Sequence, residues 1–105
     1  MIFDHVSVTW GRDETFSISG EVHNVTVQDA IIGQGLETHS CGGLMQTDHG
    51  VSLFRNLYID NKTRNPKVKG MNDFQNNVCF SCRFDSYHLL LSIPLKRCFN
   101  TSGRL

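Results

Sequence analysis

The sequence predicts an all-β fold in which short strands are wound into a solenoid, and three observations support it. Short runs rich in Val, Ile, Leu, Phe and Tyr are bounded by Gly, Asn, Asp and Ser, the pattern of strands separated by turns. No long segment before Asp85 has a helical period. The runs also superpose on one another at steps of about 20 to 30 residues, the period of repeats that stack into solenoids.

We expect the strands in four runs, at residues 4–10, 25–33, 51–60 and 73–80. In our superposition a polar residue begins each repeat unit, followed by a small or amide residue and then an apolar one. The polar positions are Asp4, Asp29, Arg55 and Asn76, which are 25, 26 and 21 residues apart.

Equivalent positions of a solenoid stack on one another, so we expect the apolar residues of the repeats to line up inside the coils. Asn56 should then lie over Asn77 and form an amide ladder at a bend. A small β-sandwich with meander connections is the alternative that the strand pattern leaves open.

The composition changes after about Cys82, where the Gly and Asn punctuation disappears and one apolar run is broken by Pro94. We therefore predict a partial solenoid domain at residues 1–82 and a divergent tail at residues 83–105 outside the coil stack. We expect the residues from about Cys79 onward, which include this tail, to come from a frameshift, a read-through intron or a gene-model error. We also expect the chain to be a piece of a longer protein, because it begins inside a coil without a secretory signal.

The charges are balanced overall but unevenly distributed. Ten basic and ten acidic residues give a net charge of zero, and 39% of the residues are hydrophobic, so we expect neither a nucleic-acid partner nor a membrane partner. Seven acids and one base lie in residues 1–50, whereas nine bases and three acids lie in residues 51–105. This separation suggests a local electrostatic role within the domain.

Cysteines and glycosylation motifs give weaker signals. Cys79 and Cys82 form a CxxC pair, but a structural zinc site would have to recruit Cys98 and His88 at an unusual spacing, so we favour unpaired thiols for these residues and for Cys41. Three N-x-[ST] sequons begin at Asn24, Asn61 and Asn100 and would be glycan acceptors in the secretory pathway.

Four segments resemble one known family in the same order. DHVSVTWGRDETFSIS, NVTVQDAIIGQGLETHSCGGLM, GVSLFRNLYIDNKTRNPKVKG and NDFQNNV are similar to consecutive coils of the pectate and pectin lyases of polysaccharide lyase family one. The resemblance covers roughly residues 3–78. It implies a right-handed parallel β-helix, here of about three to four coils, and an extracellular enzyme that cleaves the α-1,4-galacturonan of pectin by β-elimination. It also implies that the full-length domain is a monomer.

This reaction removes a proton beside the uronate carboxylate, so it needs a base and cationic groups that stabilise the developing charge. The family base is an arginine that opens an R-x-P motif, which by this resemblance is Arg64 in Arg64-Asn65-Pro66. An arginine can act as a base where other cations disfavour its charged form. The resemblance implies that Lys69, with Lys67 nearby, binds substrate carboxylates, and that the loop residue His39 contacts substrate. A solvated basic loop between coils is the structural alternative.

The family also binds calcium between enzyme and substrate carboxylates. By resemblance, Asp13 and Glu14 are the candidate calcium ligands, although Ser17 replaces a partner carboxylate and calcium requires six to eight oxygen ligands. We expect His5 to be structural, bonding backbone at a corner. Trp10 should pack in the core or against a coil and not serve as a sugar platform. The alternative function is an inactive remnant or a carbohydrate-binding piece without turnover.

Overall fold

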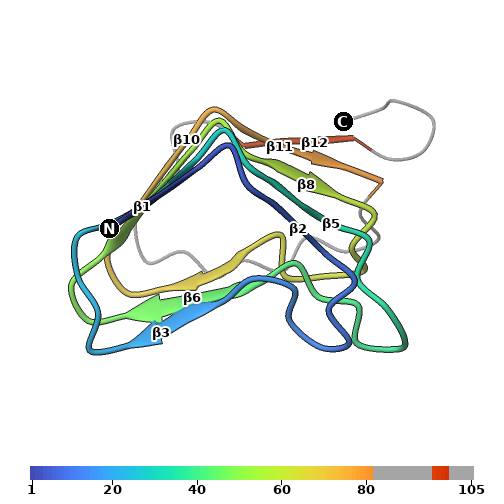
Figure 1. Cartoon of the computed structure of the whole chain (residues 1–105), viewed down its shortest axis with the longest axis horizontal. Helices are drawn as coiled ribbons and strands as arrows, with labels where there is room; N and C mark the ends of the chain where they lie inside the picture. Colours follow the sequence, from blue (N-terminus) through green and yellow to red (C-terminus); the bar gives the residue numbers. More distant parts are fainter. Residues whose placement is uncertain (82–95, 100–105) are drawn as a thin grey trace.

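The computed structural model describes residues 1–81 and 96–99, and all the elements in these residues are strands. They form three parallel sheets that wind into a β-solenoid of about three turns, as predicted (Figure 1). The first sheet has the order β1-β4-β7-β10, formed by Ile2–Asp4, Val25–Gln28, Val51–Phe54 and Asn72–Gln75.

The second sheet has the order β12-β11-β8-β5-β2, formed by Lys96–Phe99, Asn77–Phe80, Leu57–Ile59, Ile31–Gly33 and Ser7–Thr9. The third sheet has the order β3-β6-β9, formed by Ile18–Gly20, Leu44–Thr47 and Lys67–Lys69. Each of the four predicted runs is thus two strands with a bend between them. The third sheet was not expected.

One repeat step in the superposition was wrong by one residue. Asp4 pairs with Gln28 in the first sheet and Ser7 pairs with Ile31 in the second, so the first step is 24 residues and His5, not Asp4, lies over Asp29. The other two steps are confirmed, because Gln28 pairs with Phe54, which pairs with Gln75. A slip of one residue exchanges the two faces of a strand, so only the 24-residue step keeps Phe3 in line with the buried Val27.

Left-handed backbone conformations make the bends on both sides of the second sheet. At the first bend, between the first and second sheets, His5, Asp29, Arg55 and Asn76 have φ angles of 53°, 51°, 53° and 56°. After the second-sheet strands, Trp10, Gln34, Asp60 and Ser81 have φ angles of 65°, 53°, 55° and 56°. This conformation is unfavourable for most L-residues, so the surrounding coils must hold each bend in place.

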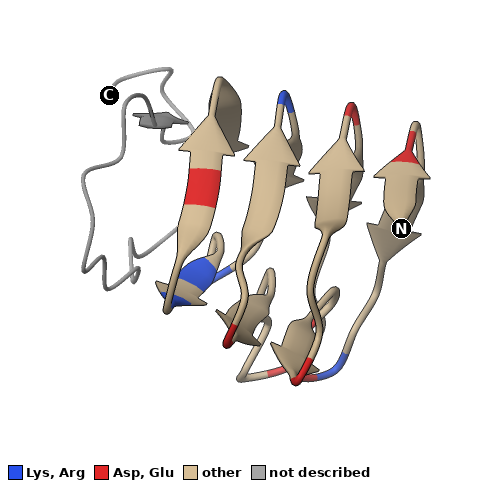
Figure 2. Ribbon diagram, turned by 90° about the vertical axis from the view of Figure 1, so that its left-hand side faces the viewer, with Lys and Arg blue, Asp and Glu red and all other residues tan. Residues whose placement is uncertain are grey.

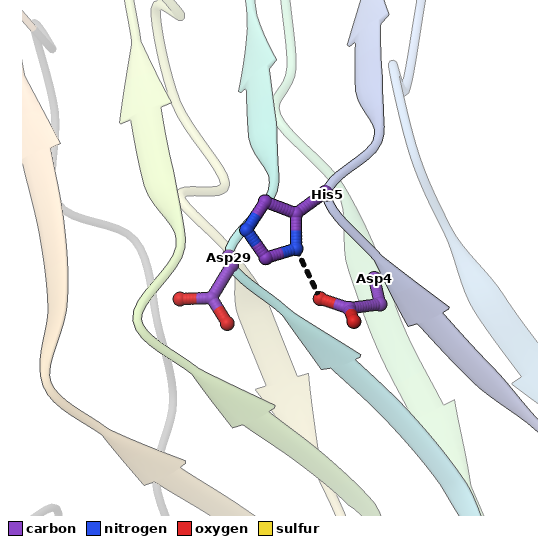
Figure 3. Close-up of side chains that lie close together, drawn as sticks. All are labelled: Asp4, His5 and Asp29. Atoms are coloured by element: carbon purple, nitrogen blue, oxygen red, sulfur yellow. Dashed lines mark hydrogen bonds and ion pairs between the residues drawn. The ribbon is translucent and has the colours of Figure 1, made fainter.

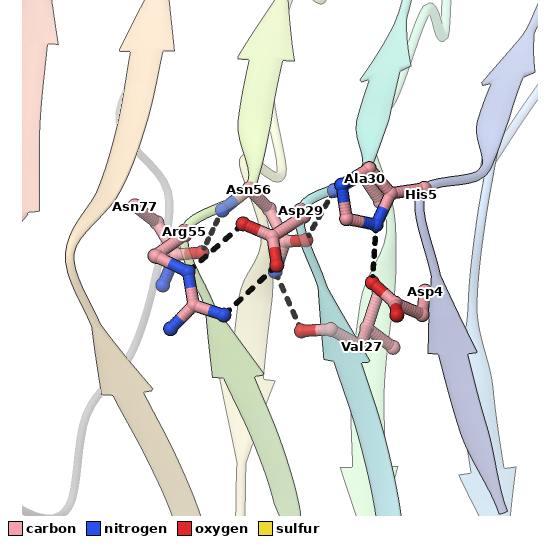
Figure 4. Close-up of polar contacts among 8 residues, drawn as sticks. All are labelled: Asp4, His5, Val27, Asp29, Ala30, Arg55, Asn56 and Asn77. Atoms are coloured by element: carbon pink, nitrogen blue, oxygen red, sulfur yellow. Dashed lines mark hydrogen bonds and ion pairs between the residues drawn. The ribbon is translucent and has the colours of Figure 1, made fainter.

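The expected amide ladder is present at the first bend, but its hydrogen bonds run to the backbone (Figure 4). The Asn56 side chain accepts from the Ala30 N–H at 3.1 Å and donates to the Val27 carbonyl at 2.9 Å. Asn77 repeats the pattern one coil later, accepting from the Asn56 N–H at 2.8 Å and donating to the Leu53 carbonyl at 2.7 Å. The amides therefore satisfy the backbone groups that the bend removes from the sheets.

The interior of the coils is apolar. Its fully buried members include Val27, Ile32, Met45, Leu53 and Tyr58. Burial, with a smaller effect of Cys79, raises the pKa of Tyr58 well above its ordinary value, so this phenol stays neutral. Trp10 does not pack in the core, because the residue is 65% exposed. Its indole N–H donates to the Gln34 side chain of the next coil at 3.1 Å, so its contact is with a neighbouring coil.

The predicted boundary at residue 82 lies at the edge of the described residues, and nearly all of the predicted tail lies outside them. Within the tail, the backbone of β12 pairs in parallel with β11. The proposed origin of the tail and its separation from the coil stack stay predictions. Of the zinc candidates, Cys79 and the backbone of Cys98 lie in the described part, whereas Cys82 and His88 do not. No helix in the described residues could cross a membrane.

Candidate active site

The predicted acidic turn and basic loop meet on adjacent edges of three successive coils. Glu14, Cys41 and Thr63 form a column of parallel bridges just before the strands of the third sheet. The Cys41 N–H donates to the Asp13 carbonyl at 2.8 Å, and the Gly43 N–H donates to the Arg64 carbonyl at 2.7 Å. The middle coil therefore fixes the backbone of both the acidic turn and the basic loop.

An ion pair joins Arg64 to Glu14 across the middle coil. The Arg64 Nη1 atom donates to the Glu14 Oε1 atom, and the two side chains are 32% and 22% exposed. Arg64 itself has a φ of 53°, and the peptide bond between Asn65 and Pro66 is cis. The structure thus brings together the predicted base and one predicted metal ligand, which are 50 residues apart in sequence.

Two lysines extend this basic region along β9, which pairs with β6 in the third sheet. Val68 is 1% exposed and faces the interior, so the side chains of Lys67 and Lys69 point to the outer face of the sheet. Lys67 is half-buried and Lys69 is exposed. In Figure 2, β9 is the blue strand at the lower left. Lys67 to Lys69 is therefore a strand with two outward cations and not a loop, while the substrate-binding role of the two lysines stays a prediction.

His39 lies on the exposed turn that precedes Cys41. Its backbone carbonyl accepts a hydrogen bond from the Cys41 thiol at 2.9 Å. Within residues 1–81, no hydrogen bond links its ring to Arg64, Lys67 or Lys69. The substrate role of His39 stays a prediction.

A second polar cluster lies at the first bend, away from the third sheet (Figure 3). The His5 ring lies between two carboxylates, with its Nδ1 atom 2.6 Å from the Asp4 Oδ1 atom. The expected bond to backbone at the corner is made by the His5 main chain, whose N–H donates to the Gln28 carbonyl at 3.2 Å. Arg55 donates to both Asp29 oxygens at 2.8 Å, and this hydrogen bonding holds the pKa of Asp29 below its ordinary value. Because the Arg55 guanidinium already binds the Asp29 carboxylate, this carboxylate is not available to a metal cation, which favours a structural role for the cluster.

Curated relatives match most of the chain. It is 83% identical over 81 residues to probable pectate lyase C from Emericella nidulans, 82% identical to that of Aspergillus oryzae and 80% identical to that of Aspergillus fumigatus. The chain is a relative of the pectate lyases. Each match covers 77% of the present chain but only 19% of the length of the curated protein. No family model and no solved structure matches the chain.

In the described part of the present chain, the residues around Glu14 do not complete a calcium site. Asp13, Glu14 and Cys41 bring three potential ligand atoms within 4.8 Å of one another. Arg64 already pairs with Glu14, however, and Cys41 is a soft thiol whose pKa is raised by burial and by the Asp13 charge, with Lys62 opposing. Because calcium takes six to eight hard oxygen ligands, Asp13 is the one carboxylate of this group left for it.

Sequence reasoning missed the residues that position Arg64. A Cβ atom on Gly42 would lie 2.6 Å from the Arg64 carbonyl oxygen, and one on Gly43 would lie 1.8 Å from the Phe16 carbonyl oxygen. Only glycine allows the middle coil to approach both neighbours this closely. The Gly42-Gly43 pair inside a repeat was the available signal.

Proposed function

We propose that this protein is a polysaccharide lyase of the pectate lyase type, which cleaves α-1,4-galacturonan by β-elimination outside the cell. The observation that carries the proposal is the 79–83% identity to probable pectate lyase C proteins, combined with a basic edge formed by Arg64, Lys67 and Lys69. Polygalacturonate or pectin would be the substrate, and the complete domain would act as a monomer.

In the proposed reaction, Arg64 accepts the C5 proton of the uronate. The electron pair of the broken C5–H bond forms a C4–C5 double bond, the C4–oxygen bond of the glycosidic link breaks, and the departing oxygen is protonated. Lys67 and Lys69 would hold substrate carboxylates and stabilise the negative charge that develops beside C5. Both lysines are point charges, so they would attract a polyuronate without the bidentate geometry of arginine.

Glu14 constrains this mechanism. Its carboxylate already pairs with the Arg64 guanidinium, so Glu14 must move away, or be engaged by another group, before Arg64 can contact the C5 proton of a substrate. A bound polyuronate brings further carboxylates to the basic edge and would compete with Glu14 for Arg64. The family's calcium would stabilise the uronate carboxylate, but the ligands described here do not complete its site, and no step is assigned to it.

Carbohydrate binding without turnover is the second candidate, and the Arg64–Glu14 ion pair favours it because Arg64 already contacts a carboxylate. We expect the 105-residue chain alone to be weakly active or inactive. Among the described strands, β1, β2 and β3 each lie at a sheet edge, and unpaired edges expose core and backbone.

A chimera distinguishes these candidates. The matched 81 residues would replace their counterpart in the Emericella nidulans protein, and the absorbance of unsaturated uronides would be followed on polygalacturonate with and without calcium. The Arg64→Ala variant should lose the product, whereas Arg55→Gln, a change to an arginine ion pair at the first bend, should retain it. Substrate binding without product in the unsubstituted chimera would favour the second candidate, and product that persists in Arg64→Ala would exclude Arg64 as the base.

A further inference from the structure

Two of the three sequons lie in the described residues, at Asn24 and Asn61, and the fold treats them in opposite ways. Asn24 is exposed at a bend just before β4, with a φ of 54°. Its backbone carbonyl accepts from the Met1 amine at 2.9 Å, while its side-chain amide makes no hydrogen bond to a residue of the described part. The Asn24 amide is therefore available for modification.

The rest of this sequon is also arranged to leave room outside the coil. Val25 and Val27 are 5% and 0% exposed and point into the core. Thr26 lies between them on β4, so its side chain points outward. Asn24 also lines a surface hollow together with His23 and His49, whose rings meet edge to face at 5.8 Å. A bulky group on Asn24 would thus extend into solvent beside a turn and would not enter the coil.

Asn61 has no such freedom. Its residue is 1% exposed, its Nδ2 atom donates to the Ile32 carbonyl at 3.0 Å, and its Oδ1 atom accepts from the Gly35 N–H at 3.2 Å. The Nδ2 atom also lies 3.1 Å from where a Cβ atom on Gly42 would be. A sugar on this nitrogen would have to occupy volume that the middle coil already fills.

We propose that Asn24 is an N-glycan acceptor when the chain passes through the secretory pathway, and that Asn61 stays unmodified in the folded protein. In the transfer, the Asn24 Nδ2 atom forms a bond to C1 of the first sugar of a lipid-diphosphate oligosaccharide. The bond between that C1 and the phosphate oxygen breaks, the lipid diphosphate leaves, and the amide nitrogen loses one proton. The inference rests on the extracellular location in the proposed function and on no part of the proposed chemistry.

The test uses the full chain behind a cleavable secretion leader in yeast, with Asn100→Gln present throughout so that two sequons remain. Thr26→Ala removes the first sequon without changing Asn24, and Thr26→Ser is the matched variant that keeps it. Endoglycosidase treatment followed by electrophoresis detects a glycan. Deglycosylation in ¹⁸O-labelled water followed by peptide mass spectrometry then shows which asparagine carried it.

We expect one endoglycosidase-sensitive shift in the parent chain and in Thr26→Ser, no shift in Thr26→Ala, and the ¹⁸O label at Asn24 alone in soluble, protease-resistant protein. An unlabelled Asn24, a labelled Asn61 in that fraction, or a shift that persists in Thr26→Ala would overturn the proposal. If the cells do not secrete the chain, the same peptides are measured in protein from the microsomal lumen. The same labelling results then support or overturn the proposal. Because the readout is the glycan, a failed lyase assay leaves this result unaffected.

Discussion

Replacing Asn56 by alanine should destabilise the fold more than any surface change, because this side chain satisfies two buried backbone groups. Alanine would leave the Ala30 N–H and the Val27 carbonyl without partners, and these two residues are 2% and 0% exposed. An orphaned buried group costs about 1–3 kcal/mol, so Asn56→Ala should lower the free energy of unfolding by about 2–6 kcal/mol. That is a large part of the about 5–15 kcal/mol available to a small domain.

Urea unfolding followed by circular dichroism measures this loss. The matched control is Gln75→Ala. Among the described residues, the exposed Gln75 side chain bonds to Asp73 alone, so this change should alter stability by less than about 0.5 kcal/mol. Asn77→Ala, which orphans the Asn56 N–H and the Leu53 carbonyl, should cost about as much as Asn56→Ala. The ladder would be refuted as a stabilising element if Asn56→Ala unfolded at the same urea concentration as Gln75→Ala.

Three further predictions follow from the charged and thiol groups. The Asp29 pKa is lowered below its ordinary 3.8, so the pairing of Asp29 with Arg55 stabilises the fold above about pH 4, and this stabilisation is lost as the pH falls further. The difference in unfolding free energy between the parent chain and Arg55→Gln should therefore shrink between pH 7 and pH 3. A difference that stays constant over this range would contradict the prediction. Buried Cys41 has a raised pKa, so peptide mapping should show iodoacetamide alkylation of its thiol at least about 100-fold slower in the native chain than in urea, and equal rates would show that this coil is open. A double-mutant cycle of Arg64→Ala and Glu14→Ala should give a coupling energy of about 1 kcal/mol in unfolding measurements, whereas additive losses would mean that the pair does not form in solution.

The repeat pattern was sufficient to predict the solenoid because apolar residues and bend residues recur in every coil. It did not predict the third sheet, since Ile18–Gly20, Leu44–Thr47 and Lys67–Lys69 are too short and too polar to form an apolar run. The register error at Asp4 has a similar origin: aspartates at positions 4 and 29 look equivalent, but the hydrogen-bonded pairing places His5 over Asp29. Sequence similarity between two bends does not determine register, whereas burial of alternate side chains does.

The candidate site was predicted as two separate groups. The resemblance identified Arg64 on one loop and the pair Asp13 and Glu14 on another, with no means of knowing that the coils place Arg64 against Glu14. That contact depends on the two glycines of the middle coil, whose role is visible only when the coils are stacked. The sequence did not decide between core and coil packing for Trp10, because a strand-ending aromatic residue has the same sequence pattern whether it packs inside or lies on a bend.

The most direct test of the central claim is the initial rate of unsaturated-uronide formation by the chimera and its Arg64→Ala variant at equal concentration. Loss of a positioned general base lowers a rate by about 10²–10⁴-fold. We therefore predict at least a 100-fold fall for Arg64→Ala and a rate close to the parent for Arg55→Gln. A rate that Arg64→Ala leaves unchanged would contradict the claim that this edge of the solenoid carries the catalytic base.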